Sequence, residues 1–210
     1  IQKINYYFIN KFNICWVMDD ETQNLAGELS KPKKLPNNYK YIGLHSRLEF
    51  SKKEKKYKLC FILSGPEPQR TSFEKIVMKS VKGRKEEIVI ILGKTEDEKR
   101  VITENNLTII SSSNTSEINK YILESEIIIS RSGYSTIMDL QKMQSKAIFV
   151  PTPGQTEQEY LAKYLKERGV CFYQKQNEFD LNKAIHESKN YSGFGRYIAE
   201  SKLTMYNNLF

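Results

Sequence analysis

From residue 58 onward, the chain alternates short apolar runs with amphipathic segments. Near-continuous apolar runs are typical of strands covered on both faces, as in a parallel sheet. We expect strands at 59–63, 88–92, 107–110, 127–129, 148–150 and 170–173. Helical periodicity predicts helices from Thr71 to 81 and at 117–124, 157–168, 180–187 and 195–207, and a further helix is expected to follow the run 127–129.

This alternation predicts an α/β fold with a Rossmann-like, doubly wound, mainly parallel sheet. Ligands of such sheets bind beyond the carboxyl ends of the strands, near the point where the strand order reverses. Upstream, residues 12–18 are expected to form one strand, which Asp19 and Asp20 end. Adjacent carboxylates there favour a cap over a metal site, because no third ligand is near. Residues 22–41 indicate an extended connection, and the charged segment 94–105 fits neither class of element.

The composition of the chain limits the kinds of catalytic or metal site that it can form. The chain has 210 residues, of which 39% are hydrophobic, enough for a packed core. Cys15, Cys60 and Cys171 are widely separated and favour reduced thiols in apolar runs. His45 and His186 are the only histidines, so a zinc site or a serine-type triad is hard to assemble from this chain.

The formal net charge is +8. A lysine-rich solubilising surface explains it most simply, and anionic lipid head groups or phosphorylated ligands are the sharper alternatives. Nucleic acid is the weakest alternative, because no recognised module is present and the lysines are dispersed. No apolar stretch approaches the roughly 20 residues of a membrane span, and no signal peptide is visible. The start at Ile1 suggests a fragment.

The run 127–140 is the most informative segment. It predicts a buried strand, a tight turn at Ser132 and Gly133, and then the first turns of a helix. Ser132, Gly133 and Ser135 can line an anion. Such a junction directs backbone N–H groups and a helix dipole at one point, which favours a phosphate. Asp139, one helical turn later, can accept two hydrogen bonds from a ribose diol; alternatively, it closes a capping box with Thr136.

Two further loops follow predicted strands. In residues 63–71, Gly65 permits a tight turn and Arg70 adds donors for an anion, although an ordinary helix-initiating loop also explains the pattern. No Gly-Lys-Ser/Thr follows, so this is not a Walker loop. In residues 151–159, Gln155, Gln158 and Glu159 offer groups that read sugar hydroxyls; a solvated helix start is the alternative.

Two arginines complete the candidates. Arg47 is a mobile phosphate partner if its segment passes over the cleft, and otherwise it is one surface arginine among many. Arg131, inside the central run, is expected either to pair with a nearby carboxylate or to act as an internal strut.

In this order and spacing, the segments around Arg47, Gly65, 130–140 and 150–159 resemble the C-terminal, nucleotide-sugar-binding domain of GT-B glycosyltransferases. The resemblance covers about residues 40–175 and is strongest to family 28, the group that includes the peptidoglycan N-acetylglucosaminyltransferase. It implies the C-terminal half of a GT-B fold and an inverting transfer of a hexosamine-type sugar, N-acetylglucosamine in the first place, from a UDP-sugar to an acceptor hydroxyl.

The resemblance also implies residue roles. The donor diphosphate is expected at a set of loop and helix-start residues: Arg47, Gly65, Arg70, Ser132, Gly133, Ser135 and Thr136. Asp139, in the place of the family's glutamate, is expected to hold the ribose, and Gln155, Gln158 and Glu159 to read the sugar. No cofactor or metal is expected, and the catalytic base is expected on a missing N-terminal domain.

The predicted organisation has three parts. Residues 1–40 are expected to be a remnant of the acceptor domain with its linker, 41–194 the nucleotide-sugar-binding domain, and 195–210 a helix reaching toward the missing half. The expected partners are a UDP-sugar, a lipid-linked or saccharide acceptor, and an acceptor domain in cis or in trans, with no nucleic acid. The expected location is the cytoplasm or the inner face of the membrane.

Two alternatives are open at this point. One is a UDP-sugar hydrolase or epimerase on the same fold, which turnover by water alone would indicate. The other is a non-catalytic UDP-sugar-binding subunit that needs a separate acceptor-domain protein. A basic nucleic-acid-binding α/β domain is a more general rival, and steep salt dependence would reveal it.

Overall fold

The computed structural model describes residues 2–22, 24–94 and 99–196, and these fall into two compact units that divide between His45 and Ser46. Each unit is described by itself. Within the part of the chain that the structure describes, no helix combines the length and the apolar character of a membrane span.

The first unit holds a helix, α1 (Gln2–Ile9), a 3-10 turn, η1 (Gly27–Leu29), and two strands, β1 (Cys15–Val17) and β2 (Tyr39–Tyr41), that pair in parallel. The strand expected over 12–18 is therefore shorter. The extended connection expected over 22–41 is also wrong in part, because β2 and η1 interrupt it. Buried Asp19 organises the intervening loop by accepting hydrogen bonds from the amides of Leu25 (3.1 Å) and Ala26 (3.0 Å).

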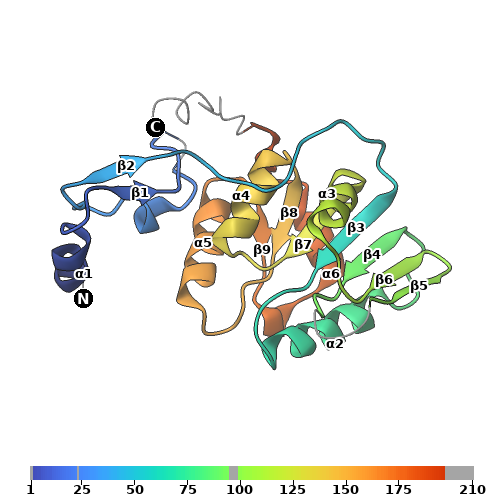
Figure 1. Cartoon of the computed structure of the whole chain (residues 1–210). Helices are drawn as coiled ribbons and strands as arrows, with labels where there is room; N and C mark the ends of the chain where they lie inside the picture. The colour runs from blue at the N-terminus through green and yellow to red at the C-terminus, as the bar shows by residue number, and fades with distance from the viewer. Residues whose placement is uncertain (1, 23, 95–98, 197–210) are drawn as a thin grey trace. The chain divides into compact units, whose positions relative to one another are not determined.

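The second unit is built on a seven-stranded sheet in the order β5-β6-β4-β3-β7-β8-β9 (Figure 1). Every neighbouring pair is parallel except β5 with β6. The expected doubly wound, mainly parallel sheet is confirmed. The strands are β3 (Tyr57–Ile62), β4 (Ile88–Ile91), β5 (Val101–Glu104), β6 (Leu107–Ile110), β7 (Ser125–Ser130), β8 (Lys146–Phe149) and β9 (Phe172–Tyr173).

Helices cover both faces of this sheet (Figure 1). One face carries α2 and α6, whose Phe73, Val77 and Ala184 pack with the strands in one hydrophobic core. The other face carries α3, α4 and α5. The helices are α2 (Gln69–Val81), α3 (Thr115–Leu123), α4 (Tyr134–Lys142), α5 (Thr156–Glu167) and α6 (Leu181–Ser188), with 3-10 turns η2 (Gln176–Glu178) and η3 (Phe194–Arg196).

The strand order reverses at the centre of the sheet. From β3 the chain winds outward through β4 and β6, and it then returns to β7 on the other side of β3 and winds through β8 and β9. Ile62, the last residue of β3, pairs with Ser130, the last residue of β7. The loops that leave β3 and β7 therefore begin side by side at the switch point, where open α/β sheets bind their ligands.

Three local expectations differ from the structure. The helix expected from Thr71 begins two residues earlier, because α2 starts at Gln69 with Pro68 as its N-cap. The segment 94–105 contains an edge strand, β5, whose residues are all exposed. Of the helix expected over 195–207, the structure shows η3, and residues 197–207 lie outside the described residues.

Candidate functional site

The junction of β7 and α4 directs an uncapped helix start toward open space. Gly133 is the N-cap of α4 and provides no side-chain cap. A Cβ atom added at Gly133 would meet nothing within 4 Å. Ser135 and Thr136 occupy the first turn of the helix. Since amides of a first helical turn lack intrahelical acceptors, this junction offers hydrogen-bond donors and a positive dipole end to an anion.

The loop after β8 is fastened to this junction by Gln158. The carbonyl oxygen of Gln158 accepts a hydrogen bond from Ser132 Oγ at 2.7 Å. Its Oε1 accepts from the Thr152 amide at 2.9 Å, and its Nε2 donates to Gln155 Oε1. Glu159 Oε1 accepts from the Gly154 amide at 3.2 Å. The three predicted sugar-binding side chains therefore lie in one cluster at the start of α5.

Gly65 brings the loop after β3 close to the same cluster. Its φ is +106°, a backbone angle that residues with a side chain rarely adopt. A Cβ atom there would lie 3.8 Å from Thr152 Oγ1. Thr152 itself is buried. The loops that leave β3, β7 and β8 are thus neighbours through Gly65, Ser132 and Thr152.

Gly93 lies against the backbone that leads into this loop, and it was not identified from the sequence. It follows β4 with a φ of +68°, and a Cβ atom there would lie 2.3 Å from the Leu63 carbonyl oxygen. Leu63 precedes the Gly65 turn directly. A glycine after an apolar run was the available signal, but only the tertiary structure shows which backbone approaches it.

Asp139 lies in the second turn of α4 and is half-buried. Its Oδ1 accepts a hydrogen bond from Ser46 Oγ at 2.6 Å. Burial raises the pKa of this carboxyl group, and the Ser46 hydrogen bond and the charge of Arg47 partly offset that rise. A capping box of Thr136 and Asp139 is not formed, because α4 already begins at Tyr134. Sequence reasoning placed Arg47 near the site but missed Ser46.

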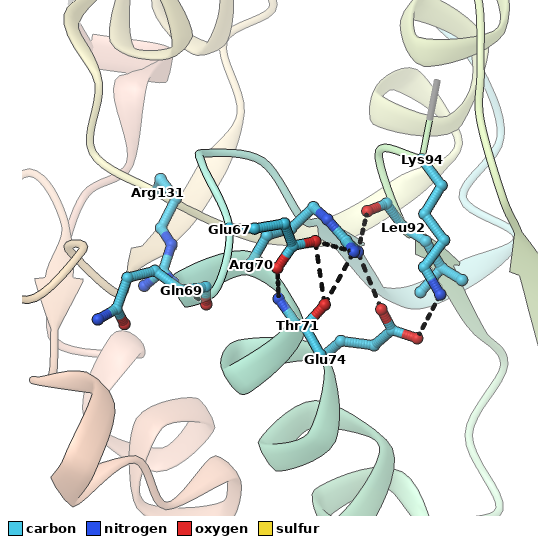
Figure 2. A network of polar contacts seen from close by, with 8 residues as sticks. All are labelled: Glu67, Gln69, Arg70, Thr71, Glu74, Leu92, Lys94 and Arg131. Atoms are coloured by element: carbon cyan, nitrogen blue, oxygen red, sulfur yellow. Dashed lines mark hydrogen bonds and ion pairs between the residues drawn. The ribbon is translucent and has the colours of Figure 1, made fainter. Parts of the chain in front are cut away.

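Arg70 lies in an ion-pair network of its own. Figure 2 shows its guanidinium between Glu67 and Glu74, with Nη1 also donating to the Leu92 carbonyl oxygen at 3.2 Å. The Glu67 carboxylate additionally accepts from the Thr71 amide at 3.1 Å. A carboxylate of the chain therefore occupies the start of α2, and Arg70 is paired with carboxylates in this structure. Its role in binding the diphosphate stays a prediction.

We expect Arg70→Met to act on stability. The substitution leaves Glu74 half-buried, with Lys94 as its remaining partner at 3.0 Å, so the free energy of unfolding should fall by roughly 1–3 kcal/mol. Chemical denaturation measures this. A loss of nucleotide affinity in a variant with unchanged stability would instead assign Arg70 to ligand binding.

The predicted residues are thus grouped in three places. Gly65, Ser132, Gly133, Gln155, Gln158 and Glu159 surround the start of α4, with Ser135 and Thr136 in its first turn. Asp139, with Ser46 and Arg47, lies further along the same helix. Arg70 forms ion pairs with Glu67 and Glu74. Among the described residues, no group of three His, Cys, Asp or Glu side chains has the arrangement of a metal site.

A doubly wound sheet with a glycine turn and an uncapped helix start at its switch point defines a Rossmann-like class of domain. The family comparison agrees with this class. Residues 59–194 match the family model described as the glycosyltransferase family 28 C-terminal domain. The chain belongs to this family.

Two curated relatives are similar over a shorter stretch. Both are named UDP-N-acetylglucosamine--N-acetylmuramyl-(pentapeptide) pyrophosphoryl-undecaprenol N-acetylglucosamine transferase. The protein from Histophilus somni (strain 129Pt) is 39% identical over 66 residues, 31% of this chain and 18% of the relative. The protein from Caldicellulosiruptor saccharolyticus is 33% identical over 70 residues, 32% and 19% respectively. Each match therefore covers about a fifth of the relative.

Solved structures of glycosyltransferases share the fold. The glycotransferase of kitacinnamycin superposes with a TM-score of 0.63 at 13% identity, over 93% of this chain and 53% of that chain. The spinosyn forosaminyltransferase SpnP gives a TM-score of 0.55 at 12% identity, over 84% and 48%. The chain spans about half the length of these proteins. Their fold confirms the expected relation to one half of a GT-B glycosyltransferase.

Proposed function

We propose that this chain is the donor-binding part of an inverting glycosyltransferase that transfers a hexosamine-type sugar, N-acetylglucosamine in the first place, from a UDP-sugar to an acceptor hydroxyl. The observation that carries the proposal is the convergence of the Gly65 loop, the Ser132–Gly133 turn and the uncapped start of α4 at the switch point of the sheet. The membership in family 28 supports the same reaction class.

The diphosphate of the donor is assigned to the start of α4. Amides of the first turn, the hydroxyls of Ser135 and Thr136, and Arg47 supply the donors that phosphate oxygens need. When the glycosidic bond breaks, negative charge grows on the departing UDP. Donors already fixed around that position stabilise the growing charge without further reorganisation, which lowers the barrier.

Asp139 is assigned to the ribose. Its Oδ1 already accepts from Ser46, and its second oxygen remains able to accept from a ribose hydroxyl. Gln155, Gln158 and Glu159 are assigned to the sugar, where neutral amides and a carboxylate match hydroxyl and acetamido groups. The curated relatives carry UDP-N-acetylglucosamine in their names, which supports this sugar over others.

The acceptor and its base belong to another part of the enzyme. In this proposal a second domain, in cis or in trans, binds a lipid-linked or saccharide acceptor, and its base removes the proton of the attacking hydroxyl. The relatives are named for an undecaprenol-linked acceptor. The net charge of +8 supports a peripheral position at an anionic cytoplasmic membrane face. No metal is assigned a role in this scheme.

Calorimetric titration of the chain with UDP, ADP and GDP tests the proposal. We expect UDP to bind at least tenfold more tightly than ADP or GDP, since a site built around one base leaves polar groups unpaired with another. UDP-N-acetylglucosamine should also bind, and UDP-glucose should bind less tightly than UDP-N-acetylglucosamine. Equal affinity for the three nucleotides, or no binding of any, would contradict the proposal.

A further inference from the structure

Arg131 is a buried cation at the centre of the three site loops. It follows β7 directly, and its residue is 2% exposed. Nη1 donates to the carbonyl oxygens of Val150 at 2.9 Å and Pro151 at 3.2 Å. Nη2 donates to the carbonyl oxygen of Gln69 at 3.1 Å and to Gln176 Oε1 at 2.6 Å.

These acceptors belong to separate segments. Val150 and Pro151 leave β8, Gln69 begins α2 after the Gly65 loop, and Gln176 begins η2. Arg131 itself precedes the Ser132–Gly133 turn. One planar side chain therefore connects the loops that leave β3, β7 and β8, and a guanidinium fork is the side chain whose fixed geometry reaches several carbonyls at once. In Figure 2, Arg131 lies beside Gln69, apart from the carboxylates around Arg70.

The charge of Arg131 has no carboxylate partner among the described residues. Its hydrogen-bond acceptors are three carbonyls and one amide, and its guanidinium lies 4.4 Å from the centre of the Phe73 ring. Its Nε is buried without a hydrogen-bond partner in the described part of the chain. Burial lowers the pKa of Arg131 to about 10, so the group is still protonated at neutral pH.

An unneutralised buried charge is costly for folding alone. Arg70 shows the contrast, because two carboxylates neutralise that guanidinium within the same region. The hydrogen bonds of Arg131 leave its charge without such a partner, because all four of its acceptors are neutral. The charge of Arg131 is therefore available to an anion that binds at the adjacent Ser132–Gly133 turn.

We propose that Arg131 is the positioning residue of the donor site: it holds the loops after β3, β7 and β8 in one arrangement, and its charge is complemented by the bound diphosphate. This inference rests on the proposed function. It predicts two separable effects, because loop position matters for every part of the ligand, whereas the charge matters only for the phosphates.

Arg131→Met and Arg131→Lys test the inference, with UDP and uridine as probes. Methionine keeps the apolar stem and loses charge and fork, whereas lysine keeps the charge. We expect Arg131→Met to weaken UDP binding about tenfold or more and uridine binding by less than about threefold. Arg131→Lys should restore most of the ratio of UDP affinity to uridine affinity that the unmodified chain shows. Calorimetry gives both affinities, and circular dichroism checks the fold.

Arg84 offers a matched control at the opposite end of the strands. Its guanidinium is also largely buried and binds Asn182 Oδ1 at 2.7 Å and Glu86 Oε1 at 2.6 Å. Arg84→Met should change neither the affinity for UDP nor the ratio of UDP to uridine affinity.

Three outcomes overturn the inference. If Arg131→Met weakens the binding of UDP and of uridine equally, the role of Arg131 is purely structural. The same holds if Arg131→Lys fails to rescue the ratio, or if both variants lose the native fold. If the unmodified chain binds no UDP at all, the proposed function fails first. If it binds UDP and the variants leave the ratio unchanged, only the inference about Arg131 fails.

Discussion

Asp139→Asn should weaken the binding of UDP-N-acetylglucosamine by about 10- to 100-fold, the loss expected when a charged hydrogen-bond acceptor becomes neutral. The physical reason is the proposed contact with the ribose hydroxyls, which a carboxylate accepts more strongly than an amide oxygen. Removing a negative charge near a diphosphate would by itself strengthen binding. An increase in affinity, measured by calorimetry, would therefore place Asp139 beside the phosphates and contradict the ribose assignment.

The pH dependence of the same interaction has a definite sign. Burial raises the pKa of Asp139 above 3.8, so on acidification this carboxylate takes up a proton earlier than an ordinary aspartate does. Protonation removes its acceptor strength, so affinity should fall as the pH decreases through the raised pKa. UDP-N-acetylglucosamine is the suitable probe, because its diphosphate does not titrate in this range. The Asp139→Asn variant should lack this dependence.

Asp139→Asn should weaken ligand binding without lowering the stability of the fold. A carboxyl group whose pKa is raised by folding opposes folding once it is ionised, so its contribution to stability decreases as the pH rises through that pKa. Asp139→Asn should therefore be no less stable than the unmodified chain at neutral pH. Asp180→Asn is a matched control, because it makes the same change at the N-cap of α6, where asparagine also caps. It should leave affinity unchanged.

Gly93→Ala should lower the free energy of unfolding by roughly 2–5 kcal/mol, the sum of two separate costs. The left-handed φ of +68° costs an alanine roughly 1–2 kcal/mol. The new Cβ would also lie 2.3 Å from the Leu63 carbonyl oxygen, which forces the backbone apart at a further cost of about 1–3 kcal/mol. Chemical denaturation followed by circular dichroism measures the change.

Gly83→Ala separates the two causes. Gly83 has a similar φ of +77°, but a Cβ atom there would meet nothing within 4 Å. This variant should lose only the backbone term of roughly 1–2 kcal/mol. Because Leu63 leads into the Gly65 loop, Gly93→Ala should also weaken UDP binding, whereas Gly83→Ala should not. Equal losses of stability in the two variants would show that the loop accommodates the added methyl group.

The sheet was predictable because each of its central strands is specified locally. The apolar runs that became β3, β4, β7 and β8 lie between helices with clear periodicity, and buried parallel strands need little more information than that. The short strand β5 was missed because its four residues are exposed and carry no apolar pattern of a core. Helix α1 and strand β2 were missed for a related reason, since mixed polar and aromatic residues show no clear period.

The candidate site was predictable to the extent that it follows the ends of strands. Ser132, Gly133 and Gly65 were found because parallel strands place their carboxyl ends at one edge. The ion pairs of Arg70 with Glu67 and Glu74 were not predictable from its position after a loop. Both partner carboxylates are close in sequence, but only the path of α2 decides that Glu67 and Glu74 surround the guanidinium.

By itself, the sequence determined the fold class, the positions of the central sheet-forming segments along the chain and the edge of the sheet at which the candidate site lies, because these depend on local apolar patterns and on chain direction. The tertiary structure alone decided the contacts between segments far apart in the chain. Ser46 meets Asp139 across 93 positions, Arg131 meets Gln69 across 62, and Gly93 must be small because a distant backbone passes beside it. Such contacts arise from packing in three dimensions, on which local propensity carries no information.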